Sequence, residues 1–154
     1  MLYEIGYINP ALITPYVGQF VRLLSSRNNR LVWGSMIALA TIAQQCAAEL
    51  YSQVALIKRV MESGSVITVD AGVKVLAGIA AFDAGYGTTL FPDLLQHLAT
   101  CRPKEVTQHA ESTLVAVTAE NKAAFKAVVE KRMSDLSAAQ QTRVKRVLKA
   151  AEKR

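Results

Sequence analysis

The sequence predicts an all-α protein in which about four antiparallel helix pairs stack side by side as a short α-solenoid. A motif of small and apolar residues recurs along the chain at a spacing of about 37–38 residues. A fixed period of about 20–50 residues is typical of solenoids, in which each unit buries its apolar face against its neighbours. Hydrophobic residues make up 51% of the 154 residues and aromatic residues only 6%, a mixture that favours close-packed helices over a β-sandwich.

The recurring motif has three equivalent positions, which hold a leucine, a β-branched residue and a small residue. These are Leu39, Leu76 and Leu114; Ile42, Ile79 and Val117; and Ser35, Gly72 and Ala110. We expect the motif to mark the second helix of each pair. The repeat divides the single domain into units of about 10–47, 49–82, 88–118 and 119–153.

The first pair is predicted from its helix-start signals. Asn9-Pro10 and Thr14-Pro15 each place a proline after a residue type that caps helices, where the missing N–H costs nothing. Apolar residues at helical spacing then predict a first helix over 15–24 and a second over about 30–47, separated by the polar turn 25–29.

The second pair follows the same plan, with helices expected over about 49–62 and 67–82. The segment Val66-Ile67-Thr68-Val69 has strand propensity, and only the repeat argues that the helix begins there.

A loop over 83–89 is expected to separate the second and third units, because Gly85 and Gly87 lie within it. It lacks the lysine and the preceding strand that a Walker phosphate-binding loop requires, so we interpret it as a connector only. The third pair is predicted over 89–100 and 103–118, with Pro103 opening its second helix.

The last pair, over about 120–135 and 138–153, departs from the repeat because its final helix has a narrow apolar face. A terminal unit has no neighbour on one side, and a polar outer surface is what a solenoid cap requires. The departure therefore agrees with the array.

The spacing, the helix-pair plan and the small-then-apolar motif resemble HEAT repeats of the armadillo-like superfamily. Pro15 and Pro92 match the proline often found in the first helix of such units, whereas the typical Asp and Arg are mostly missing. The resemblance covers about residues 11–118 well and 119–154 weakly. It implies a right-handed superhelix and a role as a scaffold or binding surface.

Charge is distributed unevenly along the chain. Residues 1–119 carry eight basic and eight acidic side chains, so residues 120–154 hold the whole net charge of +6. Arginine and lysine recur along one stripe of the last helix, and such a stripe can contact phosphates. A solvated cap is the preferred interpretation of the run, because charged residues usually keep a terminal helix in water. Nucleic-acid binding through residues 131–154 is the alternative function. The candidate phosphate contacts are Arg143, Arg146, Lys149 and Lys153.

The predicted partner-binding surface is the one lined by the second helices. Trp33 falls at a repeat position that holds Asp70 and Gln108 in other units, which suggests an exposed interface anchor. The alternative is that Trp33 packs on Tyr16 or Phe20. The full set of candidate residues is Trp33, Ile37, Thr41, Gln44, Asp70, Lys74, Gln108, Glu111 and Ser112.

His97 and Cys101 lie four residues apart on one expected helix and could share a face with His109 of the next helix. A structural zinc site needs four ligands, and only two of these residues have convincing spacing. We therefore expect a packed cysteine, a surface histidine and no metal or other cofactor. No orienting group or oxyanion hole accompanies a Cys–His pair, so no catalytic residue is predicted and the protein is not expected to be an enzyme.

The two cysteines, Cys46 and Cys101, and the absence of a signal-peptide pattern predict a soluble protein of the reducing cytoplasm. The longest apolar stretches, 31–43 and 71–82, are broken well before the length of about 20 residues that spans a membrane. The expected function is a non-catalytic scaffold or adaptor for a protein partner. Self-association through an end of the array or through the Trp33 region is a further alternative.

Overall fold

The computed structural model describes all 154 residues and contains ten α-helices, four short 3-10 turns and no strand. The helices are α1 (Leu2–Ile8), α2 (Val17–Leu23), α3 (Asn29–Ile42), α4 (Ala47–Tyr51), α5 (Val54–Ser63), α6 (Val66–Phe82), α7 (Ala84–Thr100), α8 (Pro103–Thr113), α9 (Lys122–Lys131) and α10 (Ala138–Glu152). The 3-10 turns are Pro10–Leu12, Thr14–Tyr16, Leu114–Ala116 and Met133–Asp135. None of the helices combines the length and the apolar character needed to span a bilayer.

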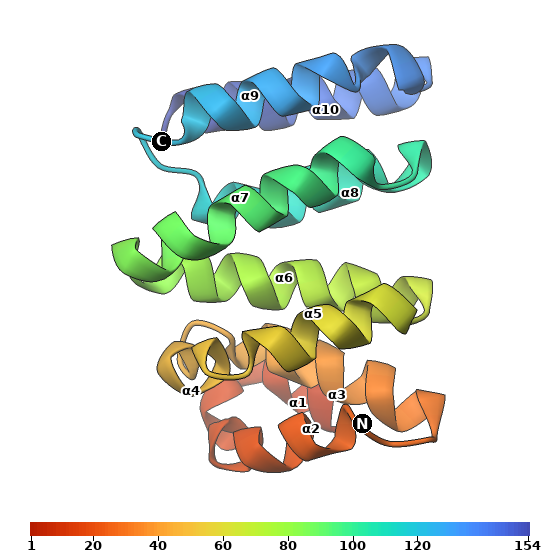
Figure 1. Ribbon diagram of the computed structural model, residues 1–154, viewed down its shortest axis with the longest axis vertical. Coiled ribbons are helices and arrows are strands. Elements are labelled where there is room, and N and C mark those ends of the chain that lie inside the picture. Colours follow the sequence, from red (N-terminus) through yellow and green to blue (C-terminus); the bar gives the residue numbers. More distant parts are fainter.

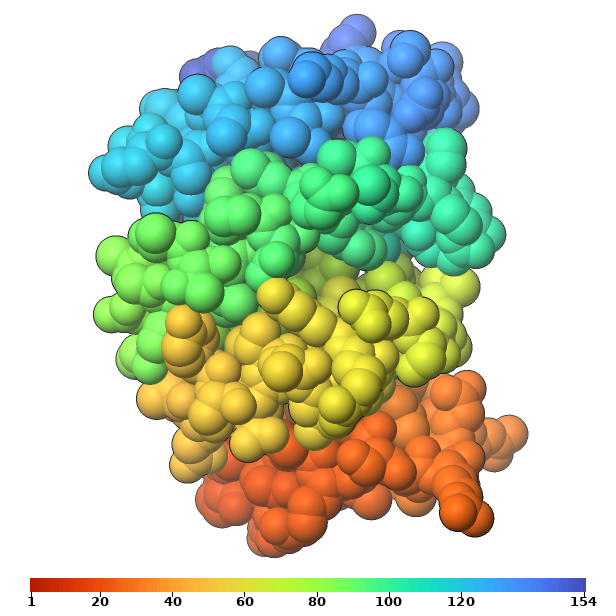
Figure 2. Space-filling model, in the orientation of Figure 1, coloured from red at the N-terminus to blue at the C-terminus, as the bar shows by residue number.

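The helices lie roughly side by side and follow one another in chain order along the long axis of the molecule (Figure 1). One row consists of α3, α6, α8 and α10, and each of these helices contacts the next. A second row of α5, α7 and α9 lies in front of it (Figure 1). In the space-filling view the colours of the sequence follow one another in layers along the long axis (Figure 2). On this face, each layer therefore borders mainly the layers that precede and follow it in the chain.

Helix α6 is the centre of the core because other helices cover it on most sides. It contacts α3, α4, α5, α7 and α8, and residues 71–80 are buried apart from Lys74. A helix that is apolar nearly all round is stable only when it is enclosed in this way. The enclosure explains why the β-branched start at Val66 is helical, and Ser65 caps the helix by accepting a hydrogen bond from the Thr68 backbone N–H at 3.4 Å.

The expected loop over 83–89 is wrong, because residues 84–89 form the beginning of α7 and Asp83 is its N-cap. The Asp83 carboxylate accepts hydrogen bonds from the backbone N–H groups of Gly85 and Tyr86, at 2.8 and 3.2 Å, and so caps the helix. Gly87 allows the first turn to approach α6, since a Cβ atom there would lie 3.0 Å from the Ala80 carbonyl oxygen. Gly87 therefore marks a close approach of two helices and not a loop between them.

Other boundaries differ more modestly from the prediction. Residues 2–8 form a helix that the sequence pattern did not reveal, and the helix expected over 30–47 ends at Ile42. Thr14 does not cap a helix: it begins a 3-10 turn, and its hydroxyl donates to the Ala11 carbonyl at 3.1 Å. The helices expected over 67–82, 103–118 and 138–153 are confirmed, the second of them finishing in a 3-10 turn.

Candidate functional site

Three consecutive helices of one row, α3, α6 and α8, form a face with a groove of about 400 Å³. The groove contains four of the candidate partner-binding residues, Thr41, Gln44, Lys74 and Ser112. Its remaining lining residues are Ala40, Ala43, Gln45, Gly78 and Val115. Because these residues come from three separate parts of the chain, the groove exists only when α3, α6 and α8 pack together.

The polar side chains of the groove are largely available to a ligand. Lys74 is exposed and has no carboxylate within ion-pair distance. Gln44 and Gln45 are also exposed, and neither side chain makes a hydrogen bond within the protein. Small residues keep the groove shallow, since Gly78 packs so closely on Ala43 that an added Cβ atom would lie 2.6 Å from the Ala43 Cβ atom.

The other candidate residues of this face do not line the groove, and three of them contact other side chains of the protein. Trp33 is half-buried and packs against Tyr3 of α1, with ring centroids 6.2 Å apart. Ile37 is half-buried, and Gln108 is exposed outside the groove. Asp70 and Glu111 each bind a side chain from another helix. The structure therefore brings together the middle of the predicted surface and leaves Trp33 at one end, beside a helix that the sequence did not predict.

The basic stripe of α10 divides into a paired and an unpaired part. Arg143 donates from Nε to the Glu111 carboxylate at 2.6 Å, so it ties α10 to α8. Arg146, Lys149 and Lys153 are exposed, form no ion pair and surround a shallow depression together with Arg154. Only the unpaired group is free to meet a phosphate.

A chain of polar contacts joins α6, α8 and α7. Asp70 accepts a hydrogen bond from His109 Nε2 at 2.6 Å, and His109 Nδ1 lies 2.8 Å from His97 Nε2. His109 is completely buried, whereas the Asp70 side chain is 23% exposed. The chain therefore runs from a carboxylate near the surface through the protein interior to a half-buried imidazole.

The surroundings shift the acidity of two groups near this chain. Burial is the main cause that lowers the pKa of His97, and the neighbouring His109 lowers it further. Burial also raises the pKa of the Cys101 thiol, against the opposing effect of the Arg132 guanidinium. Both shifts favour uncharged side chains in the folded protein.

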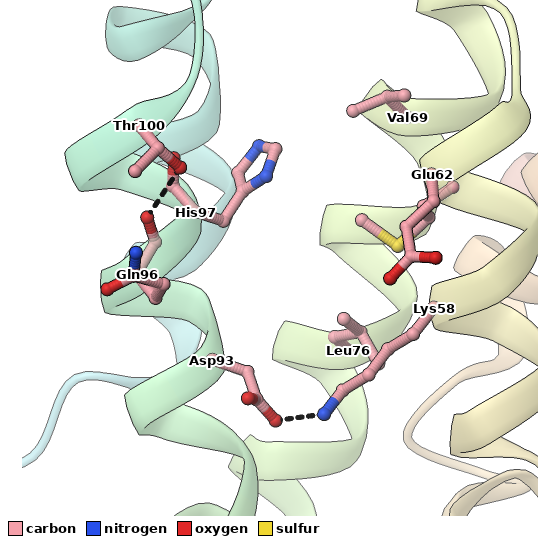
Figure 3. A pocket seen from close by; sticks show the side chains of 9 residues that line it. Lys58, Glu62, Val69, Leu76, Asp93, Gln96, His97 and Thr100 are labelled. Atoms are coloured by element: carbon pink, nitrogen blue, oxygen red, sulfur yellow. Dashed lines mark hydrogen bonds and ion pairs between the residues drawn. The ribbon is translucent and has the colours of Figure 1, made fainter.

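His97 also lines a pocket of about 340 Å³ between α5, α6 and α7. Figure 3 shows Lys58 and Asp93 paired across one end of this pocket and the His97 imidazole extending from α7 toward α6 at the other. The carboxylate of Glu62 faces the same space (Figure 3). The pocket thus combines charged groups of both signs with the apolar walls of Met61, Val69 and Leu76.

Sequence reasoning did not identify the pairing of Asp70 with His109. The two residues lie 39 positions apart, close to the repeat spacing, so they occupy nearby positions on neighbouring second helices. The spacing was the available signal, because α6 and α8 contact each other in the structure. Cys101 is half-buried and packs against the core, as expected, whereas His97 is half-buried and is not the surface histidine that the sequence predicted.

Comparison of the chain with models of protein families, with curated proteins and with solved structures gives no match.

Proposed function

We propose that the chain is a short right-handed solenoid of HEAT-like helix pairs, and that it binds another protein, without catalysis, through the face of α3, α6 and α8. The repeat period supports the architecture, as does the contact of each helix in this row with the next. A stacked array offers an extended and shallow surface, which suits a polypeptide better than a small reactant.

The groove between α3, α6 and α8 is the single observation that carries this proposal. Thr41, Lys74 and Ser112 lie on three different helices that the sequence predicts as second helices. All three line the same groove of about 400 Å³. Its floor of small residues lets the backbone of a ligand approach closely. Its rim of unpaired amides offers donors and acceptors to a peptide main chain.

The partner proposed for this groove is an acidic segment of another protein. Lys74 is an exposed ammonium group without a carboxylate of its own, near the middle of the face. The net charge of +6 lies on residues 120–154, outside the groove, and it attracts acidic partners to the molecule over the distance of a Debye length. An acidic side chain that pairs with Lys74 would fix the register of the segment, while Gln44 and Gln45 bind its main chain.

Capture from a lysate of the source cells by three forms of the immobilised chain tests the proposal. Lys74→Glu reverses the charge at the groove, and Arg59→Glu makes the same change on α5, outside the groove. Both residues are exposed and unpaired, so neither change should unfold the protein. We expect quantitative mass spectrometry to find a protein that the wild type and Arg59→Glu retain and that Lys74→Glu loses.

Direct binding of that protein, once purified, must then weaken by about 10-fold or more with Lys74→Glu, the size expected for a close charge pair that becomes a repulsion. If every captured protein is retained equally by the two variants, the groove is not the binding surface and the proposal is refuted.

Nucleic-acid binding remains the second candidate, because Arg146, Lys149 and Lys153 form an unpaired basic patch with Arg154. Phosphate contacts release counterions, so such binding weakens steeply as salt rises. Retention on duplex or single-stranded DNA or RNA at about 50 mM salt, abolished by Lys149→Glu with Lys153→Glu, would favour this candidate. No retention at that concentration rules it out.

A further inference from the structure

Three side chains with metal-binding atoms converge between α7 and α8, away from the groove. His97 and Cys101 come from the end of α7, and His109 from the middle of α8. One ligand atom from each of them lies within 4.8 Å of the other two. The four-residue spacing of His97 and Cys101 places both on one helical face, and α8 packs against that face.

Asp70 fixes which ring nitrogen of His109 carries the proton. Because the Asp70 carboxylate accepts a hydrogen bond from Nε2–H at 2.6 Å, His109 has an unprotonated Nδ1, and that atom lies 2.8 Å from His97 Nε2. A histidine ligand almost always donates its second ring N–H to such a carboxylate or carbonyl. Here the carboxylate comes from a third helix, α6, and His109 itself is completely buried.

The distances between the ligand atoms are close to those of a tetrahedral zinc centre. Zn–N bonds of about 2.0–2.1 Å hold two imidazole nitrogens about 3.3 Å apart, and the two nitrogens here are 2.8 Å apart. A Zn–S bond of about 2.3 Å sets the sulfur about 3.6 Å from each nitrogen, within the 4.8 Å spread observed. Side-chain rotations that move the histidine nitrogens by about half an ångström and the cysteine sulfur by about 1 Å would therefore give the tetrahedral arrangement.

We propose that His97 Nε2, His109 Nδ1 and Cys101 Sγ bind one Zn²⁺ ion, with Asp70 as the outer hydrogen-bond partner. Two imidazoles and a thiolate form a donor set that zinc prefers. Water fills the fourth position, on the side where His97 borders the pocket of about 340 Å³. The ion joins α7 to α8 and, through Asp70, to α6.

The proton balance of this binding step is simple. The Cys101 thiol releases its proton to solvent as the Zn–S bond forms, and the neutral His97 moves its own proton from Nε2 to Nδ1 through water. One proton therefore leaves the protein for each zinc ion bound. No oxidant or reductant takes part.

The test uses the full chain, freed of metal with a chelator and then titrated with Zn²⁺ against a chromogenic chelator and, separately, with Co²⁺. We expect one ion per chain and a higher melting temperature with zinc. Co²⁺ should give a thiolate-to-cobalt charge-transfer band and the intense visible bands of four-coordination.

Three variants with one matched control locate the ion. Cys101→Ser should abolish the charge-transfer band, and Asp70→Asn should weaken zinc binding by about 10–100-fold. His97→Ala removes a half-buried ligand, so it tests the site without the packing loss that a change at the buried His109 would cause. Cys46→Ser removes the only other cysteine, also half-buried, and should leave affinity and spectrum unchanged.

The proposal is overturned if the wild type takes up no stoichiometric zinc at micromolar concentration. It is overturned equally if Cys101→Ser and His97→Ala, folded by circular dichroism, bind zinc as the wild type does, or if the charge-transfer band disappears with Cys46→Ser.

Discussion

The Glu105 side chain caps the first turn of α8 by accepting hydrogen bonds from both the backbone and the side chain of Arg102. One carboxylate oxygen accepts the Arg102 backbone N–H at 3.3 Å, and the other accepts the guanidinium Nε–H at 3.0 Å. The side chain is only 11% exposed, and these contacts hold its pKa below the ordinary value of 4.5. The carboxylate is therefore most stabilising while it remains ionised.

This arrangement predicts a loss of stability in acid. Because the pKa is lower in the folded chain than in the unfolded one, the unfolded chain gains a proton first, and the free energy of unfolding falls as the pH drops below 4.5 toward the folded value. In urea titrations across this range, Glu105→Gln should show a shallower pH dependence than the wild type. It should also be less stable by about 1 kcal/mol at neutral pH, the usual cost of a weakened cap.

Glu152→Gln is the matched control for this measurement. It removes a carboxylate that pairs with Lys126 in open solvent, where water and salt screen the interaction. Its effect on the pH dependence should be smaller. An equal or larger effect of Glu152→Gln would show that the contact with Arg102 is not what protects the ionised form.

Individual residues of the candidate site differ in how far the sequence could predict them. The repeat alone placed Thr41, Lys74 and Ser112 on second helices, and the structure puts all three in one groove. The contact of Asp70 with His109 depends on the direction of both side chains and on the distance between α6 and α8. A periodic pattern predicts which face of a helix is buried. It does not predict the direction of a side chain or the distance between two helices.

Two glycines in helices of the same row illustrate how closely α3 and α6 pack. An added Cβ atom at Gly78 of α6 would lie 2.6 Å from the Ala43 Cβ atom, just beyond the end of α3. The same atom at Gly34 of α3 would have nothing closer than the flexible end of Met1, at 4.0 Å. The first glycine is required by packing, and the second is not.

Alanine at these two positions should therefore have opposite effects. Gly34→Ala should stabilise the protein by about 0.5–1 kcal/mol, because alanine restricts the unfolded chain and favours a helix. Gly78→Ala should destabilise it by about 1–3 kcal/mol, since Ala43 has no side chain that could move aside. Urea unfolding of the two variants measures both, and stabilisation by Gly78→Ala would contradict the close packing of α3 on α6.

Whole helices were predictable where the apolar pattern was long and uninterrupted. The boundaries of α6 and α10 lie within one residue of the expected ones, and in the structure Ser65 and Ser137 cap the two helices. The start of α7 was missed because Gly85 and Gly87 have low helix propensity. There, capping by Asp83 and contact with α6 outweigh that propensity, and both are visible only in the structure.

In the molecule as a whole, charge and polarity are separated along the stack. Residues 1–119 are neutral overall, while residues 120–154 hold the net charge of +6 and include the unpaired Arg146, Lys149 and Lys153. The groove of α3, α6 and α8 lies in the neutral part, and Lys74 is its exposed cation. A protein partner in the groove and a phosphate on α10 would thus occupy separate places on one row of helices.

Hydrogen exchange of the chain with and without its captured protein partner tests the central claim most directly. Burial beneath a partner slows the exchange of the amides that it covers. If the face of α3, α6 and α8 binds the partner, slowed exchange will be confined to peptides that cover residues 40–45, 74–78 and 108–115. Slowed exchange confined to α5 and α7, or to residues 143–154, would contradict the claim.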